Sequence, residues 1–90
     1  MSAEKKRLTV LNRLSAEYPS AISLEKIRKD THLDDHDFKR TVAYLQEKQY
    51  IDLENVAQGV EGVYGEARIT VLGLDYVEAK SRQVRASIIR

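Results

Sequence analysis

Near residue 50 the hydrophobic pattern of the chain changes its period. Before that point, apolar residues recur at steps of three and four, which is typical of helices that pack on one side. After it, residues 50–53 alternate between apolar and polar, as strands do, and residues 67–71 supply an antiparallel partner. Gly59, Gly62 and Gly65 lie between these segments and predict a flexible hairpin loop. The pattern therefore predicts helices first and a two-stranded hairpin after them.

Two helices are predicted before residue 32. The first covers Lys5–Tyr18 and ends at Pro19, because a proline pushes the residue before it out of the helical region. Ser20–Ile22 has the size of a connector or a stub of strand. Ser23 then caps a short helix that reaches about Thr31. The inward positions are Leu8, Leu11, Leu14 and Tyr18 in the first helix, and Leu24 and Ile27 in the second.

The third helix has the clearest start. Asp34 can cap the amide of Asp37, while Leu33 and Phe38 occupy the two positions of a hydrophobic staple. Gln49 ends the helix. The inward positions are predicted to be Phe38, Val42 and Leu45, and the outward ones include Lys39, Arg40, Ala43, Tyr44 and Glu47.

Ninety residues leave room for one hydrophobic core, so the chain is predicted to form a single domain over residues 1–79. The last element of that domain is a fourth helix that Thr70 can cap, with Gly73 as a mild penalty in its first turn. Residues 80–90 form a basic tail or an extension of this helix. The apolar residues on or near its inner face are Leu74, Tyr76 and Val77.

The order of these elements resembles that of the winged helix-turn-helix family. Leu-Gln-Glu-Lys-Gln-Tyr-Ile at residues 45–51 is similar to the end of the family's recognition helix, usually Leu-x-x-x-Gly, then an aliphatic residue or Tyr, then Ile. Residues 69–76 are similar to the Ile-Thr-x-x-Gly-x-x-Tyr segment that opens the last helix in many bacterial, archaeal and phage members, and residues 22–27 to the entry of the second helix. The resemblance covers about Leu8 to Ala79. It implies an α+β, mostly α fold, with a three-helix core, a two-stranded β-hairpin wing and a C-terminal helix.

Gln49 departs from the family pattern, because it stands where most members have glycine. A glutamine at that position is expected to take a left-handed backbone conformation, at a cost of about 1 kcal/mol. The fold tolerates a cost of this size.

The resemblance also implies which residues would meet DNA. The family places its third helix in the major groove and its wing on the phosphate backbone, and the second helix can cross the backbone. Arginine can pair with guanine, and tyrosine can touch a thymine methyl or donate to phosphate. The residues expected to contact bases are Lys39, Arg40 and Tyr44. Those expected to contact phosphates are Lys26, Arg28, Lys29 and Arg68, and the contact expected from the wing is Tyr64.

A protein of this kind would act as a non-catalytic transcription regulator, by occupying double-stranded DNA. One domain of this size offers few contacts, so a homodimer that joins two half-sites is expected. The expected dimer surface is the tail that carries Val84, Ile88 and Ile89, with or without the first helix.

Charge opposes part of this interpretation. Residues 34–48 contain four acidic and three basic side chains, and residues 50–68 contain Asp52, Glu54, Glu61 and Glu66 against Arg68 alone. The expected DNA-contacting surface therefore has a net charge of −4, and carboxylates repel phosphates. The alternative is a winged-helix protein–protein interaction module whose acidic wing and Tyr64 meet a basic partner. The candidate DNA-contacting residues also fit a solvated helix face.

Other functional classes find little support in the sequence. Fifteen basic against fourteen acidic residues argue against a polycationic nucleic-acid binder, and the absence of cysteine excludes disulfides and thiolate zinc sites. His32 and His36 have metal-ligand spacing, but the cap at Asp34 breaks the helix between them, so no metal site is predicted. No motif indicates catalysis or a cofactor. Without an apolar run of membrane length, we expect a cytoplasmic protein with no membrane partner.

Overall fold

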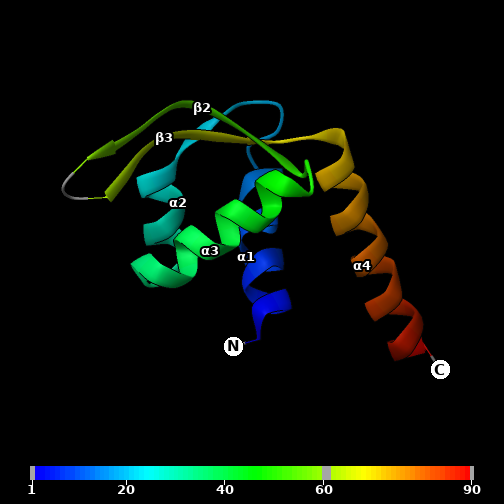
Figure 1. The fold of residues 1–90 in the computed structure, drawn as a ribbon. Coiled ribbons are helices and arrows are strands. Elements are labelled where there is room, and N and C mark those ends of the chain that lie inside the picture. The colour runs from blue at the N-terminus through cyan, green and yellow to red at the C-terminus, as the bar shows by residue number, and fades with distance from the viewer. Residues whose placement is uncertain (1, 60–61, 90) are drawn as a thin grey trace.

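The computed structural model describes the backbone of residues 2–59 and 62–89, and the side chains of residues 2–57 and 64–83 (Figure 1). Three helices come first and an antiparallel hairpin and a long helix follow, as the sequence predicts. The elements are α1 (Ala3–Ser15), β1 (Ile22–Ser23), α2 (Leu24–Thr31), α3 (Asp35–Glu47), β2 (Ile51–Gly59), β3 (Gly62–Ile69) and α4 (Val71–Ile89).

Side-chain caps fix where the helices begin. A serine, threonine or aspartate oxygen accepts a hydrogen bond from a backbone amide that has no partner inside the helix, which stabilises the first turn by about 1 kcal/mol. All three predicted caps are confirmed. Their bonds join Lys26 N to Ser23 Oγ (3.1 Å), Asp37 N to Asp34 Oδ1 (2.7 Å) and Gly73 N to Thr70 Oγ1 (3.1 Å).

The first helix differs from its prediction at its end. It stops at Ser15, after which two turns lead to Ser20, so Tyr18 does not lie on the helical face and is 45% exposed. Its inward positions are Val10, Leu11 and Leu14, whereas Leu8 is half-buried. The other predicted inward positions of α2 and α3 are confirmed. The buried core consists of Val10, Leu11, Leu14, Ile22, Leu24, Ile27, Leu33, Phe38, Val42, Leu45, Ile51, Ala67 and Ile69.

The three strands form an antiparallel sheet in the order β1-β3-β2. The two long strands reach Gly59 and start again at Gly62, so most of the segment predicted as a hairpin loop between residues 53 and 67 is strand. At a bulge in β2, Asn55 and Val56 together oppose the single residue Gly65 of β3. Gly65 has a φ of 141°, and a Cβ there would lie 2.9 Å from the Glu54 carbonyl oxygen. The hairpin extends past α2 and away from α4 as the wing (Figure 1).

Hydrogen bonds connect the segment after α3 to the residue that caps α4. Gln49 has a φ of 63°, which confirms the expected left-handed backbone, and its carbonyl accepts a hydrogen bond from Thr70 Oγ1 at 2.6 Å. Thr70 N donates to the Tyr50 carbonyl at 3.0 Å. A Cβ at Gly73 would overlap that same carbonyl oxygen, so this glycine is required for close approach. The rings of Tyr50 and Tyr76 stack with centroids 4.8 Å apart.

Helix α4 packs against the body near its start and is tied to α1 by an ion pair. Leu74, Tyr76 and Val77 contact the core as predicted, and Lys80 Nζ lies 2.7 Å from Glu4 Oε1. Among the residues that the structure describes, no helix combines the length and apolar content that crossing a membrane requires. The side chains on which the dimer prediction rests, Val84, Ile88 and Ile89, lie outside the described ones, as do residues 60 and 61 of the wing.

Candidate nucleic-acid interface

Helix α3 has one buried face and one face free for contacts. Phe38, Thr41, Val42 and Leu45 are buried, and the helical period places the opposite stripe in solvent. Four of the five predicted outward positions are confirmed as exposed. They are Lys39, Arg40, Ala43 and Glu47.

The two cations on this helix differ in their electrostatic partners. Lys39 Nζ lies 3.1 Å from Asp35 Oδ2, one turn earlier, so its charge is partly compensated. Arg40 is exposed, and within the described part of the chain no carboxylate lies within ion-pair distance of its guanidinium. Arg40 is therefore the more available cation for a phosphate or a base edge.

Tyr44 does not face outward as predicted. It is half-buried against the core, on the flank of α3 that faces α1, and the guanidinium carbon of Arg7 lies 3.5 Å from its ring centroid. Lys48 Nζ approaches the same ring to 5.8 Å. The helical period explains the error, because Tyr44 lies between the exposed stripe and the buried Thr41 and Leu45. Base contact by Tyr44 stays a prediction, with one ring face already covered.

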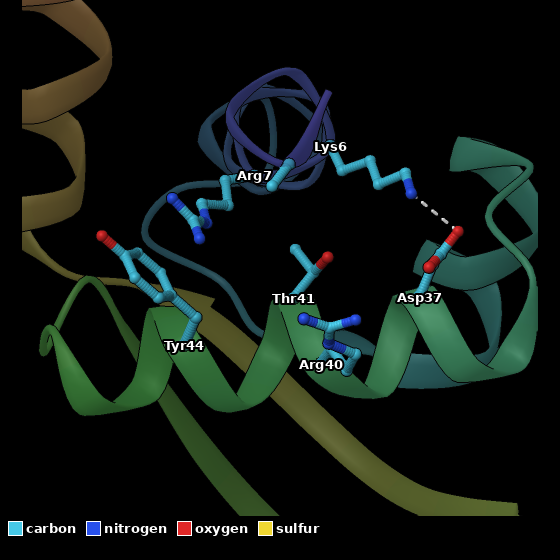
Figure 2. A pocket seen from close by; sticks show the side chains of 7 residues that line it. Lys6, Arg7, Asp37, Arg40, Thr41 and Tyr44 are labelled. Atoms are coloured by element: carbon cyan, nitrogen blue, oxygen red, sulfur yellow. Dashed lines mark hydrogen bonds and ion pairs between the residues drawn. The ribbon is translucent and has the colours of Figure 1, made fainter. Parts of the chain in front are cut away.

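Between α1 and α3 lies a cleft of about 180 Å³, which we call the α1–α3 cleft (Figure 2). Lys6 Nζ donates to Asp37 Oδ2 across it at 2.8 Å, and this contact lowers the pKa of Asp37 below its usual range. Asp37 is therefore ionised at neutral pH. The lining residues are Ala3, Lys6, Arg7, Asp37, Arg40, Thr41 and Tyr44.

Lys6 and Arg7 line the site although neither is among the residues predicted to contact DNA. Each lies one helical turn before a buried residue of α1, Val10 and Leu11 respectively, so both project from the side of α1 that packs on the domain. That spacing is a signal that the sequence contains. What the sequence does not contain is the packing of α1 against α3, which brings the two cations beside Arg40.

The predicted phosphate-contacting residues of α2 lie apart from this cleft. Lys26 and Lys29 are exposed and Arg28 is half-buried, and none of the three lines the α1–α3 cleft. Lys29 Nζ is 3.3 Å from Glu25 Oε1 in an exposed pair of adjacent turns. Such pairs break at little cost, so these cations remain usable for phosphate contacts.

The wing has an acidic surface. Arg68 pairs with Asp52 on the neighbouring strand at 3.5 Å, while Glu54 and Glu66 stand directly opposite each other with no cation between them in the described residues. Asn55 Nδ2 donates to Glu66 Oε1 at 3.4 Å. Like charges in opposed positions destabilise a hairpin and repel phosphate. Tyr64 on β3 is 43% exposed, as predicted, and Glu61 lies outside the described residues.

On its other flank, α3 borders an apolar groove of about 240 Å³, the α3–wing groove. Val56 at its edge is 46% exposed. Lys39 lines this groove, so the two cations of α3 point to different flanks. The lining residues are Leu24, Phe38, Lys39, Val42, Ala43, Gln46, Leu53 and Val56.

The histidine spacing has no metal geometry. His32 is the left-handed C-cap of α2, with a φ of 59°, and α3 starts after Asp34, so the helix is interrupted between His32 and His36. Within the described ranges, no three His, Asp or Glu side chains gather in a way that could hold a metal ion.

A scan against protein-family models and a search of curated proteins give no match. Among solved structures, the chain is similar to the PcaV transcriptional regulator from Streptomyces coelicolor, crystallised in complex with its natural ligand. The two chains are 20% identical with a TM-score of 0.63, and the match covers 90% of this chain and 59% of the regulator. This chain thus spans about three-fifths of the regulator's length. At this identity the likeness shows the fold alone. The predicted α+β, mostly α, winged-helix fold is confirmed.

Proposed function

We propose that this protein is a DNA-binding, transcription-regulator-like winged-helix protein, which acts by occupying duplex DNA without catalysis. Helix α3 would enter the major groove with Lys39 and Arg40 toward base edges. Lys26, Arg28, Lys29 and Arg68 would contact phosphates, and Tyr64 would contact the duplex from the wing. The winged-helix fold supports this proposal, as does the description of PcaV as a transcriptional regulator.

Exposure of Arg40 on the outward face of α3, without a direct ion pair in the described residues, is the observation that carries the proposal. A guanidinium presents planar donors that match both a guanine edge and a phosphate. Arg40 has this exposure, and within the described chain no carboxylate neutralises it by a direct ion pair. Asp37, one turn before Arg40, interacts with it electrostatically but is bonded to Lys6, whereas Lys39 has Asp35 in a direct pair.

The proposal is tested by binding to random-sequence duplex DNA across a series of salt concentrations. Each phosphate contact releases counterions, so the logarithm of the binding constant falls linearly with the logarithm of salt concentration, by about 0.9 for each contact. We expect a slope that corresponds to several contacts. No binding at low salt would contradict the proposal.

The α3–wing groove and the acidic wing favour a second candidate, a protein–protein interaction module. An apolar groove beside opposed carboxylates suits an apolar side chain flanked by cations, and it does not suit a phosphate. In this case duplex DNA would fail to bind at low salt, and the module would bind basic peptides with a weaker dependence on salt. The same salt series therefore separates the two candidates.

We further propose that the DNA-binding form is a homodimer. One domain offers a single recognition helix, and two such helices on neighbouring half-sites supply the contacts that specific binding requires. Light scattering at high micromolar concentration tests this proposal, and a mass equal to one chain would contradict it.

A further inference from the structure

Two arginines at the α1–α3 cleft lack carboxylate partners. Among the described arginines, Arg13, Arg68 and Arg82 each lie within ion-pair distance of an aspartate or glutamate, whereas Arg28, outside the cleft, does not. Arg7 and Arg40 have no direct ion pair within the same residues, although both line a cleft that contains Asp37. Asp37 lies near enough to Arg40, and Glu4 near enough to Arg7, to interact electrostatically, but Lys6 and Lys80 hold the direct contacts with these carboxylates, at 2.8 Å and 2.7 Å.

The position of Arg7 leaves its donors available. Its guanidinium carbon lies 3.5 Å from the Tyr44 ring centroid, in a cation–π contact that uses the flat face of the group. The N–H donors point outward in the guanidinium plane, so stacking fixes the group without using the hydrogen bonds that bind an anion. Figure 2 shows Arg7 and Tyr44 together on one side of the cleft.

Thr41 adds a hydroxyl to the floor of the cleft. The residue is 6% exposed, and Figure 2 shows its oxygen directed into the space between α1 and α3. Among the described residues we find no hydrogen bond for this hydroxyl. A hydroxyl that is nearly buried in a helix usually donates to a carbonyl one turn earlier, as Thr31 does to Ile27 at 2.8 Å. No side-chain oxygen or nitrogen of the described residues is both buried and without a partner, so the Thr41 oxygen is open to the cleft and can bond to a group that enters it.

Charge and volume define the chemical class of that group. The lining contains three cations and one anion, which is a surplus of two positive charges. A phosphate monoester has a charge near −2 and several acceptor oxygens, and arginine donors match it in fork geometry. The volume of about 180 Å³ is sufficient for it, because a cavity of about 150 Å³ already holds a benzene ring.

We propose that the α1–α3 cleft binds a phosphate group through Arg7, Arg40 and Thr41, while Lys6 neutralises Asp37. The group is either a phosphate of the DNA backbone or that of a small molecule. The backbone source rests on the proposed function, and the small-molecule source does not. Arg40 belongs to both the cleft and the outward face of α3, so a small phosphate in the cleft would compete with DNA for this side chain.

Inorganic phosphate is the first probe, titrated into the full chain labelled with nitrogen-15 at constant ionic strength in chloride. We expect saturable shifts of the Nε–H signals of Arg7 and Arg40 and of the Thr41 amide. Arg40→Gln and Arg7→Gln should each weaken this binding by about tenfold or more, because each removes charged hydrogen bonds. Arg82→Gln, which removes an exposed arginine of α4 outside both the cleft and the proposed DNA-contacting surface, is the matched control and should bind like the wild type.

Thr41→Val keeps both arginines and the shape of the side chain but removes the hydroxyl. It should weaken phosphate binding without altering the dispersion of the spectrum. If an arginine variant fails to fold, the Thr41→Val variant still tests the proposal. The proposal is overturned if no saturable shift occurs up to the solubility of the phosphate salt. It is equally overturned if the cleft variants bind phosphate as tightly as the Arg82→Gln control.

Duplex DNA and phenyl phosphate distinguish the two sources. For a backbone phosphate, DNA should shift the same arginine signals, and Arg7→Gln should lower the salt slope of DNA binding by about one. For a small-molecule phosphate, phenyl phosphate should bind more tightly than inorganic phosphate and DNA should leave Arg7 unaffected. Phosphate binding without DNA binding would support the proposed phosphate site and contradict the proposed function. DNA binding without phosphate binding would support the proposed function and contradict the phosphate site.

Discussion

The two flanks of α3 have opposite chemistry, although they lie on one helix of thirteen residues. The flank that faces α1 borders a cleft with three cations, one of them cancelled by Asp37. The flank that faces the wing borders an apolar groove, and the nearby hairpin sets Glu54 opposite Glu66. The net charge of −4 for α3 and the wing does not reveal this difference. That sum leaves out the cations of α1, and it does not distinguish the charges on one flank from those on the other.

The difference between the flanks predicts how the domain would lie on DNA. A helix in the major groove has one phosphate backbone on each side. The α1 flank attracts the backbone on its side, whereas the wing flank offers carboxylates and apolar side chains to the other. DNA binding would therefore depend more on α1 than on the wing, and a protein partner would find its best surface on the wing flank.

Removal of a large core side chain from α3 should have the largest effect on stability. Phe38 is buried on the inner face of α3 as part of the core, so Phe38→Ala should lower the free energy of unfolding by about 3–5 kcal/mol. Urea titration followed by circular dichroism measures the change. Lys39→Ala, on the exposed face, is the control and should change stability by no more than about 0.5 kcal/mol. Equal losses in the two variants would show that the flanks do not depend on this core contact.

The two cations of α3 provide the next test, since each belongs to a different flank. Arg40→Gln should weaken binding to duplex DNA by about tenfold, because it removes a guanidinium that has no direct ion pair in the described residues. Lys39→Gln should have a smaller effect, because Lys39 must first leave Asp35. Fluorescence anisotropy at several salt concentrations measures both. A larger loss for Lys39→Gln would reverse the assignment of the attractive flank.

Local signals explain why the sequence predicts so much of this fold. Each of the caps at Ser23, Asp34 and Thr70 needs only residues within one turn, and a pattern over a few positions is enough to find it. The left-handed Gln49 follows from the resemblance to the winged-helix family, most members of which have glycine at that position. The prediction fails for the length of the hairpin, because glycines that indicate a loop also occur at a bulge, where Gly65 lets the strands approach.

The candidate site is harder to predict, because its geometry comes from contacts distant in sequence. Lys39 and Arg40 are exposed as periodicity predicts, but Tyr44 turns to a flank where Arg7 covers its ring. Lys6 reaches Asp37 across 31 positions of the chain. No local pattern states that α1 packs beside α3, so the cleft appears only when the helices are placed together.

Removal of the repulsion on the wing should have a smaller effect of opposite sign. Glu66→Gln keeps the shape of the side chain and its acceptor oxygen, and should raise the free energy of unfolding by about 0.2–1 kcal/mol. It should also strengthen DNA binding slightly. The double variant with Glu54→Gln should gain little more stability than either single variant, because one neutral partner already ends the repulsion. Additive gains in urea titrations would show that the two carboxylates do not interact.

The smallest effect concerns the ion pair that closes the α1 flank. Lys6 donates to Asp37 and lowers the pKa of this carboxyl in the folded protein, so the pair stabilises the fold at pH values above the pKa of an unfolded aspartate, about 4. This contribution is lost as the pH falls through the lower pKa of the folded state. Asp37→Asn should therefore be less stable than the wild type at about pH 7, and the difference should shrink in acid. Both residues are partly exposed, so salt should reduce the difference as well.

Urea titrations at neutral and acidic pH measure this difference, and two lysine variants locate its source. Lys6→Gln should lose the same pH-dependent part of the stability as Asp37→Asn, because either change removes the pair. Lys5→Gln, one residue earlier on α1 and exposed, should keep it. If the gap between the wild type and Asp37→Asn stays constant from neutral to acidic pH, the contribution of Asp37 comes from something other than its charge. Lys6 would then be free to bind an anion in the cleft, and the attractive flank would gain one more cation.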